Sequence, residues 1–191
     1  DSRTGDLECL GGYELAGPRL DLWRAPIDNE RNFHGVALEP EWRALGLDRV
    51  TRRIEAVNVD NQELTVVTRV APAASRVGFT TELRWSLEGS SLRLQFTATP
   101  DGEWPFPLPR IGLRLALPAS LANVGWFGLG PGESYPDSRR AARVSRYRSS
   151  LDDLQTPYVY PQENGHRSDV RWVEFDDGTG RGIRIEGSPW F

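Results

Sequence analysis

The stretch Val77-Gly-Phe-Thr-Thr-Glu-Leu-Arg-Trp-Ser-Leu87 decides the fold class of this 191-residue chain. Its apolar residues, apart from Gly, all occupy odd positions, namely Val77, Phe79, Leu83, Trp85 and Leu87. Successive side chains of a β-strand point to opposite faces, so this period of two predicts a strand with one buried and one solvated face. The turn residues Glu88-Gly-Ser-Ser91 follow, and an apolar residue at every second position from Leu92 to Phe96 then predicts a β-hairpin.

The same alternation predicts further strands on both sides of this hairpin. They cover residues 54–59 and 64–70 around a turn at 60–62, residues 111–117, and residues 169–175 and 182–186 around a turn at 176–180. One short helix is predicted at 39–47, with Pro40 near its start and Gly46 near its end. Two segments rich in Gly, Pro and aromatic residues, 123–140 and 152–167, are predicted to be loops that carry binding groups.

Strands at this spacing indicate an all-β antiparallel sandwich or barrel and exclude the eight strand–helix pairs of a TIM barrel. No linker, repeat or low-complexity segment divides the chain, so residues 1–191 are predicted to form a single domain. The chain contains no methionine, which indicates that it was cut from a larger protein.

Composition excludes several classes of function. All 23 basic residues are arginine, yet the net charge is −4, which disfavours nucleic-acid binding. No apolar run is long enough to cross a membrane, and the first 20 residues are too polar for a signal peptide. Cys9 is the only cysteine, so no internal disulfide and no thiolate metal cage can form. A cytoplasmic protein is the more economical prediction.

Four motifs occur in a fixed order. Leu22-Trp-Arg-Ala-Pro-Ile-Asp-Asn29 precedes Trp42 and Gly46 of the predicted helix, and Pro109-Arg-Ile-Gly112 follows. Next come Trp126-Phe-Gly-Leu-Gly-Pro-Gly-Glu-Ser-Tyr-Pro-Asp137 and Thr156-Pro-Tyr-Val-Tyr-Pro-Gln-Glu-Asn-Gly165. Together they resemble the C-terminal, or small-chain, domain of the multidomain β-galactosidases of glycoside hydrolase family 2, over residues 10–191.

This resemblance implies an antiparallel supersandwich like that of the galactose mutarotases, incomplete at its C-terminal end. It also implies that the parent hydrolyses terminal β-D-galactosides with retention, and that a TIM-barrel domain earlier in the same chain carries the catalytic carboxylates and metal ligands. The chain itself is then a structural module beside the substrate cleft, inactive alone and without a cofactor. Strand edges left open by the missing C-terminal strands would favour self-association or a homo-oligomer.

The alternative is a carbohydrate-binding or mutarotase-like module. Mutarotation needs a general acid and a general base, and His166 lies in the polar cluster Glu163-Asn-Gly-His-Arg167. A sugar site would comprise Arg110, Glu133, Glu163, Asn164 and His166. Under the structural alternative, Glu163 and Arg167 instead satisfy loop backbone groups or pair with neighbours such as Arg110. His34, in a polar loop, is predicted to be exposed.

The first motif also has two interpretations. Trp23, Arg24, Asp28 and Asn29 could face a neighbouring domain, or Asp28 and Asn29 could cap the turn after Pro26. Retaining hydrolysis needs two carboxylates about 5–5.5 Å apart, and no spacing in the sequence pairs any two of the loop carboxylates in this way. Those carboxylates are Asp28, Glu133, Asp137, Asp152, Asp153 and Glu163. No loop has the alternating oxygen ligands of a cation site, so no metal is predicted.

Overall fold

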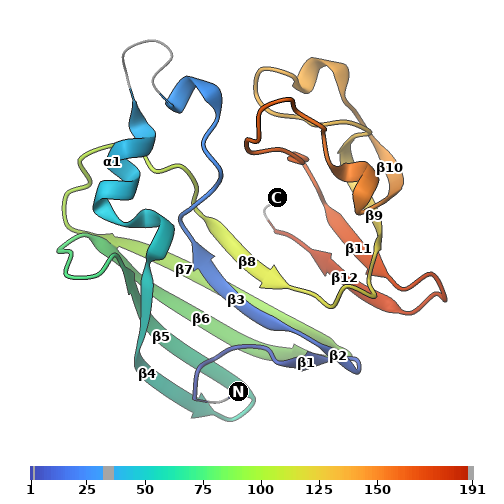
Figure 1. The fold of residues 1–191 in the computed structure, drawn as a ribbon. Helices are drawn as coiled ribbons and strands as arrows, with labels where there is room; N and C mark the ends of the chain where they lie inside the picture. Colours follow the sequence, from blue (N-terminus) through green and yellow to red (C-terminus); the bar gives the residue numbers. More distant parts are fainter. Residues whose placement is uncertain (2, 32–36, 189–191) are drawn as a thin grey trace. The chain divides into compact units, whose positions relative to one another are not determined.

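The computed structural model describes residues 1, 3–31 and 37–188 (Figure 1). Antiparallel strands dominate, which confirms the all-β class. The strands are β1 (Cys9–Leu10), β2 (Tyr13–Glu14), β3 (Ala16–Asp21), β4 (Thr51–Asp60), β5 (Glu63–Ala71), β6 (Gly78–Glu88), β7 (Ser91–Asp101), β8 (Gly112–Ala116), β9 (Asn123–Gly130), β10 (Arg143–Ser150), β11 (Trp172–Asp176) and β12 (Gly182–Glu186). The helices are α1 (Leu38–Leu45) and four 3₁₀ turns, η1 (Asp28–Glu30), η2 (Leu47–Arg49), η3 (Arg139–Ala141) and η4 (Asp152–Leu154).

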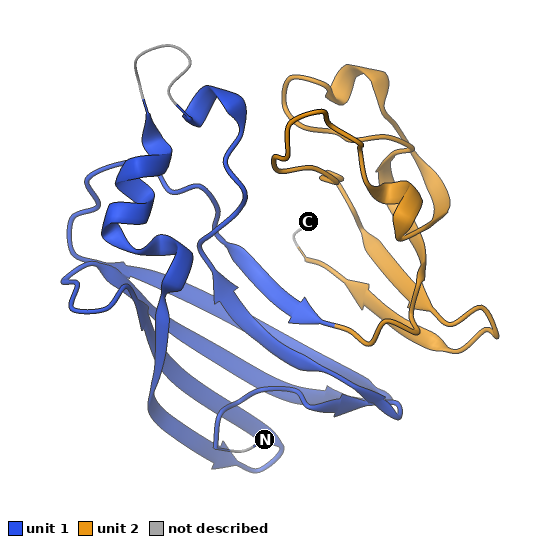
Figure 2. Ribbon diagram, in the orientation of Figure 1, with its two compact units in different colours: residues 1–116 blue, residues 117–191 orange. Residues whose placement is uncertain are grey.

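The chain divides into two compact units, Asp1–Ala116 and Leu117–Phe191 (Figure 2). Each contains its own four-stranded antiparallel sheet, in the orders β4-β5-β6-β7 and β10-β9-β11-β12. That residues 1–191 form a single domain stays a prediction. His34 lies outside the described residues.

The sheet of the first unit confirms both hairpins that alternation predicts there. Strands β6 and β7 pair from Gly78↔Asp101 to Glu88↔Ser91, and β4 pairs with β5 around the turn at 61–62. Phe79 and Leu83 are buried as expected. Leu87 is 64% exposed instead, because it lies beside the turn at the end of the sheet.

The core of this unit lies on one face of the sheet. Leu20 of β3 and Leu22 after it are buried against Val70 and Phe79 of the sheet. In Figure 1, β3 and its partner β8 run across this face as a separate two-stranded ribbon. Strand β3 escapes prediction because Gly17-Pro18 interrupts its apolar pattern, and its pairing with β8 shifts register between Ala16 and Arg19.

Helix α1 confirms the one predicted helix. Gly46 ends it with a left-handed φ of 89°, which glycine adopts without steric cost. Trp42 is buried and donates its indole N–H to the carbonyl oxygen of Pro107 at 2.9 Å, so the helix is fixed to the segment before β8.

In the second unit the hairpin of β11 and β12 confirms the two late strands. The assignment of residues 123–140 as an irregular loop is wrong over its first half. Residues 123–130 form β9, which pairs with both β10 and β11. Their glycines allow close approach of neighbouring backbone, since a Cβ on Gly128 would lie 2.8 Å from the Cα of Val170. Val124, Trp126 and Val170 form the core.

Candidate functional site

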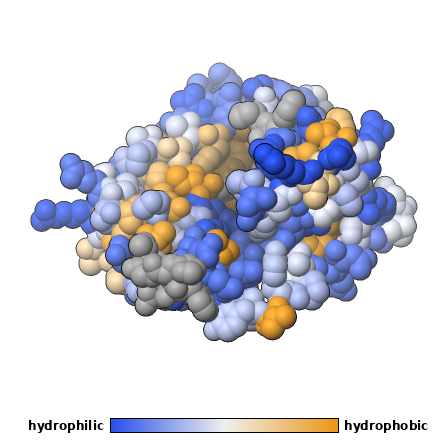
Figure 3. Space-filling model, turned by 90° about the horizontal axis from the view of Figure 1, so that it is seen from above, coloured by the Kyte–Doolittle hydropathy of each residue, from blue (hydrophilic) through white to orange (hydrophobic). Residues whose placement is uncertain are grey.

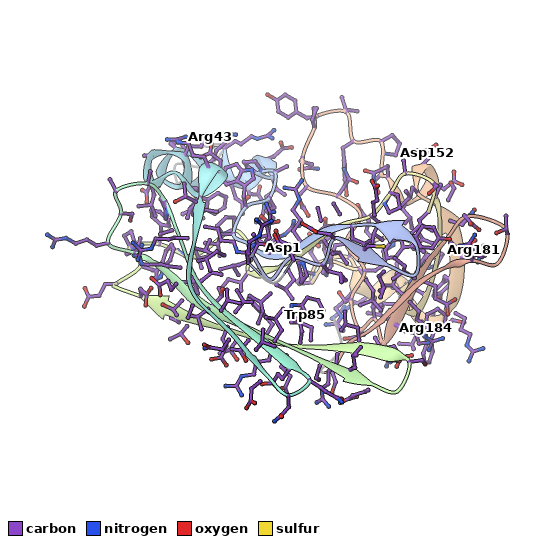
Figure 4. All side chains as sticks on the ribbon, turned by 90° about the horizontal axis from the view of Figure 1, so that it is seen from below. Asp1, Arg43, Trp85, Asp152, Arg181 and Arg184 are labelled. Atoms are coloured by element: carbon purple, nitrogen blue, oxygen red, sulfur yellow. The ribbon has the colours of Figure 1, made fainter. Side chains whose placement is uncertain are left out.

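The loops of the second unit hold most of the polar residues that the sequence singles out. One loop follows β9, and the other begins near Asp152, which is labelled in Figure 4, and runs to β11. Ser134, fully buried, joins them: its amide donates to the His166 carbonyl at 3.0 Å, and its hydroxyl accepts the Ser168 amide at 2.7 Å. The Ser168 hydroxyl donates to the Ser134 carbonyl at 2.7 Å. The two loops are therefore clamped together at their bases.

Glu133 makes a second link between the loops. Its Oε1 accepts the Gly165 amide at 2.5 Å, and its Oε2 accepts the Tyr158 hydroxyl at 2.7 Å. Burial raises the pKa of Glu133, but hydrogen bonds from Gly165, Tyr158 and Thr156 and the charge of Arg167 outweigh it, so the pKa is lowered. A carboxylate held in this way stays an anion and does not serve as a general acid, which needs a raised pKa.

Arg167 satisfies three loop carbonyls at once. Its Nη1 donates to the carbonyl oxygens of Leu154 at 3.2 Å and Gly165 at 3.0 Å, and its Nη2 donates to that of Pro131 at 3.1 Å. Its guanidinium also lies over the ring of Trp126, 5.5 Å from the centroid. Burial lowers the pKa of Arg167, against the opposing charge of Glu133. The expectation that Arg167 satisfies loop backbone groups is consistent with these contacts.

Tyr135 and His166 stack between the loops, with ring centroids 4.9 Å apart and planes inclined by 30°. His166 Nε2 lies 2.9 Å from the Ser168 hydroxyl. Burial, followed by the charges of Glu163 and Glu133, raises the pKa of Tyr135 to about 12. The Tyr135 hydroxyl is buried, and among the described residues none reaches hydrogen-bonding geometry to it. It therefore remains a neutral phenol.

The residues of the predicted sugar site are divided between the two units. Glu133, Glu163, Asn164 and His166 lie in the loops of the second unit, whereas Arg110 lies in the first, 3.5 Å from the Asp21 carboxylate. The Asn164 amide nitrogen donates to the Gln162 carbonyl at 3.4 Å. The sequence singles out Tyr135 and Tyr158 only as aromatic residues of the two loops, either among the binding groups or covering the ends of the sandwich, and it gives no sign of the two clamping serines, Ser134 and Ser168.

Two of the predicted interface residues of the first unit, Trp23 and Arg24, lie beside α1. Trp23 packs edge-on against Trp42 at 6.5 Å, and the Arg43 guanidinium lies over the Trp23 ring at 4.9 Å. Figure 4 shows Arg43 at the outer side of this helix. Arg24 binds both carboxylate oxygens of Glu30, at 2.8 and 2.5 Å, and donates to the Pro109 carbonyl at 2.8 Å. Arg24 is thus held by its own unit.

Asp28 and Asn29 lie in η1, and Asn29 is exposed. One of the two interpretations expected Asp28 and Asn29 to cap this turn, but neither side chain does so. Instead, Glu30 Oε2 accepts the Ile27 amide at 3.0 Å. The longer Glu30 side chain reaches back to this amide while also binding Arg24. A role of Trp23, Arg24, Asp28 and Asn29 at a domain interface stays a prediction.

Asp152 and Asp153 lie in η4, directly after β10. The Ser150 hydroxyl accepts the Asp153 amide at 3.1 Å and lies 2.7 Å from the Asp153 carboxylate, so the local hydrogen bonds centre on Ser150. Within the described residues, no group of three or more His, Cys, Asp or Glu side chains is arranged to hold a metal ion. Across the same residues, no helix combines the length and apolar character of a membrane span.

Comparison with known proteins gives the same family as the resemblance of the four motifs. The family model described as beta galactosidase small chain matches residues 1–190. The chain is 42% identical to a beta-galactosidase of Arthrobacter sp. (strain B7), over 97% of this chain and 20% of that protein. It is 36% identical to a beta-galactosidase of Vibrio cholerae, over 90% of this chain and 18% of that protein. It is 31% identical to a beta-galactosidase of Kluyveromyces lactis, over 95% of this chain and 18% of that protein. The chain therefore spans about a fifth of the length of these relatives.

Proposed function

The chain belongs to the β-galactosidase small-chain family, and we propose that it serves as the small-chain domain of an enzyme that hydrolyses terminal β-D-galactosides with retention. The observation that carries the proposal is the match over residues 1–190 together with relatives about five times longer. The rest of such an enzyme supplies the TIM-barrel domain with the acid and the nucleophile, and the galactoside binds there. The enzyme is proposed to be cytoplasmic.

In this proposal the chain has a structural task beside the cleft. The loop chemistry supports it: Glu133, Arg167 and Ser134 direct their polar atoms to main-chain and side-chain groups of their own loops. A catalytic carboxylate pair needs one member with a raised pKa, and the pKa of Glu133 is lowered. These residues act as a rigid support, and no cofactor is required for that task.

The sugar-binding alternative is less well supported. Sugar hydroxyls are recognised by polar groups that can bind them, and each carboxylate oxygen of Glu133 already has one of its two acceptor sites occupied by a donor of the protein. The Asn164 amide nitrogen is directed to the Gln162 carbonyl, and its buried Oδ1 has no hydrogen-bond partner among the described residues.

Turnover of a chromogenic β-galactoside tests the proposal. The purified 191-residue chain is expected to give no rate above buffer, whereas the full-length enzyme is expected to release the β-anomer of galactose first, as read by NMR immediately after mixing. Turnover by the purified chain that disappears in Glu163→Gln would overturn the structural role. Release of the α-anomer first would overturn retention, and an inactive full-length enzyme would overturn the galactosidase assignment.

A further inference from the structure

Three consecutive apolar side chains project from the second loop of the second unit. Tyr158 is 40% exposed, Val159 103% and Tyr160 61%, and Pro157 and Pro161 flank them. We call residues 157–161 the loop tip. The face displayed in the space-filling view carries apolar surface in patches among hydrophilic residues (Figure 3). A run of exposed apolar residues at a loop tip is typical of a contact surface.

The loop tip is held in place before any partner binds. The Tyr158 hydroxyl donates to Glu133, and the Tyr158 amide donates to the Thr156 carbonyl at 2.8 Å. The base of the loop is fixed by the Gly165 amide on Glu133 and by Arg167 on the Leu154 carbonyl. Two prolines restrict the backbone further. A loop ordered in advance loses little conformational entropy on binding, which favours docking.

The charges around the loop tip define the chemistry of its partner. Residues 150–167 contain three carboxylates, Asp152, Asp153 and Glu163, and one basic residue, Arg167, whose guanidinium is directed to carbonyls of the loops themselves. Glu133 adds a fourth negative charge through its contact with Tyr158. Complementarity across an interface then requires an apolar socket for Val159 and Tyr160 with basic side chains at its rim.

The identity of the partner is inferred from the length of the related proteins, most of which lies outside the part that matches this chain. The chain spans about a fifth of its relatives, so four-fifths of such a polypeptide lie elsewhere. We propose that the loop tip inserts into an apolar, basic-rimmed socket on that remaining part of the same β-galactosidase polypeptide. This inference rests on the proposed function and adds to it the surface through which the module is held.

Site-specific photocrosslinking in the full-length enzyme tests the docking. A p-benzoylphenylalanine residue replaces Val159, and in a matched control it replaces Val144, an apolar residue of β10 that is 46% exposed. After illumination, crosslinks are separated on a denaturing gel and mapped by peptide mass spectrometry. We expect a link within one polypeptide from position 159 to a peptide outside residues 1–191, at a yield at least tenfold above that of the control.

Every other outcome overturns the proposal. A crosslinked dimer would place a second copy of the enzyme on the loop tip, and a link within residues 1–191 would place this chain itself there. No link, or equal yields at 144 and 159, would leave the tip without a specific partner. A link at 159 that is competed only by galactose would indicate a sugar site. Because the crosslink is read by mass, it is independent of galactosidase activity, so failure of the proposed function and failure of this inference are distinguishable.

Discussion

Glu133 illustrates how its surroundings determine the role of a single carboxylate. Its two oxygens accept hydrogen bonds from the Gly165 amide and the Tyr158 hydroxyl, and these contacts join the two loops of the second unit. They also lower its pKa against the effect of burial. Glu133 therefore contributes to the stability of the loops, and this contribution depends on its carboxylate being charged.

Replacing Glu133 by Gln is expected to lower the free energy of unfolding by about 1–3 kcal/mol at pH 7, the cost of losing hydrogen bonds to a charged group. The two donors bind different carboxylate oxygens, and the amide replaces one of these by an NH₂ group that cannot accept, so one donor loses its partner. The pKa of Glu133 is lower in the folded chain, so the stability due to its charge is present above the ordinary value of 4.5 and lost as the pH falls through the folded value. The difference between the two proteins should therefore disappear in acid.

Urea unfolding followed by fluorescence at several pH values measures this difference. Asp137→Asn is the control, because Asp137 is an exposed carboxylate of the same loop. The proposed loop-joining role is wrong if both variants lose the same stability, or if the Glu133→Gln deficit is unchanged well below pH 4.5.

At this scale the sequence predicts some roles and misses others. Gly and Pro content, with acidic and aromatic residues, correctly identifies the second loop segment as irregular. The place of Arg167 in this loop also suggests that it satisfies backbone groups, because a long side chain with several donors has many loop carbonyls in reach. The partner of Glu133 lies 32 positions away at Gly165, and the backbone that brings them together is not encoded by local spacing. The cap of the η1 turn is missed for a different reason: it is local, but the longer Glu30 side chain, rather than Asp28 or Asn29, reaches back to the Ile27 amide.

Strand β9 shows where sequence patterns fail for a whole element. Its sequence Asn-Val-Gly-Trp-Phe-Gly-Leu-Gly contains three glycines, which locally favour turns, yet it pairs with strands on both sides. Gly128 and Gly130 are needed because neighbouring groups approach closely: a Cβ on Gly130 would lie 2.7 Å from the Tyr147 ring. By contrast, β6 and β7 follow simple alternation, because one face is buried and the other solvated.

Gly128→Ala is expected to destabilise the second unit by about 1–3 kcal/mol, the usual cost of overpacking. Its new Cβ would lie 2.8 Å from the Cα of Val170 and 3.0 Å from the Asp169 carbonyl oxygen, and main chain cannot move aside easily. Gly132→Ala is the matched control, since nothing lies within 4 Å of its Cβ position. The control should leave the urea midpoint unchanged or raise stability by up to about 1 kcal/mol. Equal effects of both changes would show that β9 does not pack as described.

For the whole molecule, the open question is whether its two compact units unfold together. Each has its own sheet and core, as expected of separate domains. The connection between them is short and only partly buried. Residues 117–122 join β8 to β9, and three of them, Ala119, Ser120 and Ala122, are exposed. Leu121 among them is 1% exposed, and this buried anchor is unlike the exposed, polar segments in which domain boundaries normally fall.

We therefore expect one cooperative transition for the chain, in agreement with the single domain that the sequence predicts. Val66→Ala in the first unit and Val124→Ala in the second each remove buried methyl groups and should cost on the order of 2 kcal/mol. In a single transition, either change shifts the unfolding of both units by the same amount. Hydrogen exchange read by mass spectrometry on peptides from β5 and β9 measures the two units separately. If Val66→Ala accelerates exchange in β5 and leaves β9 unchanged, the chain consists of two independently folding domains.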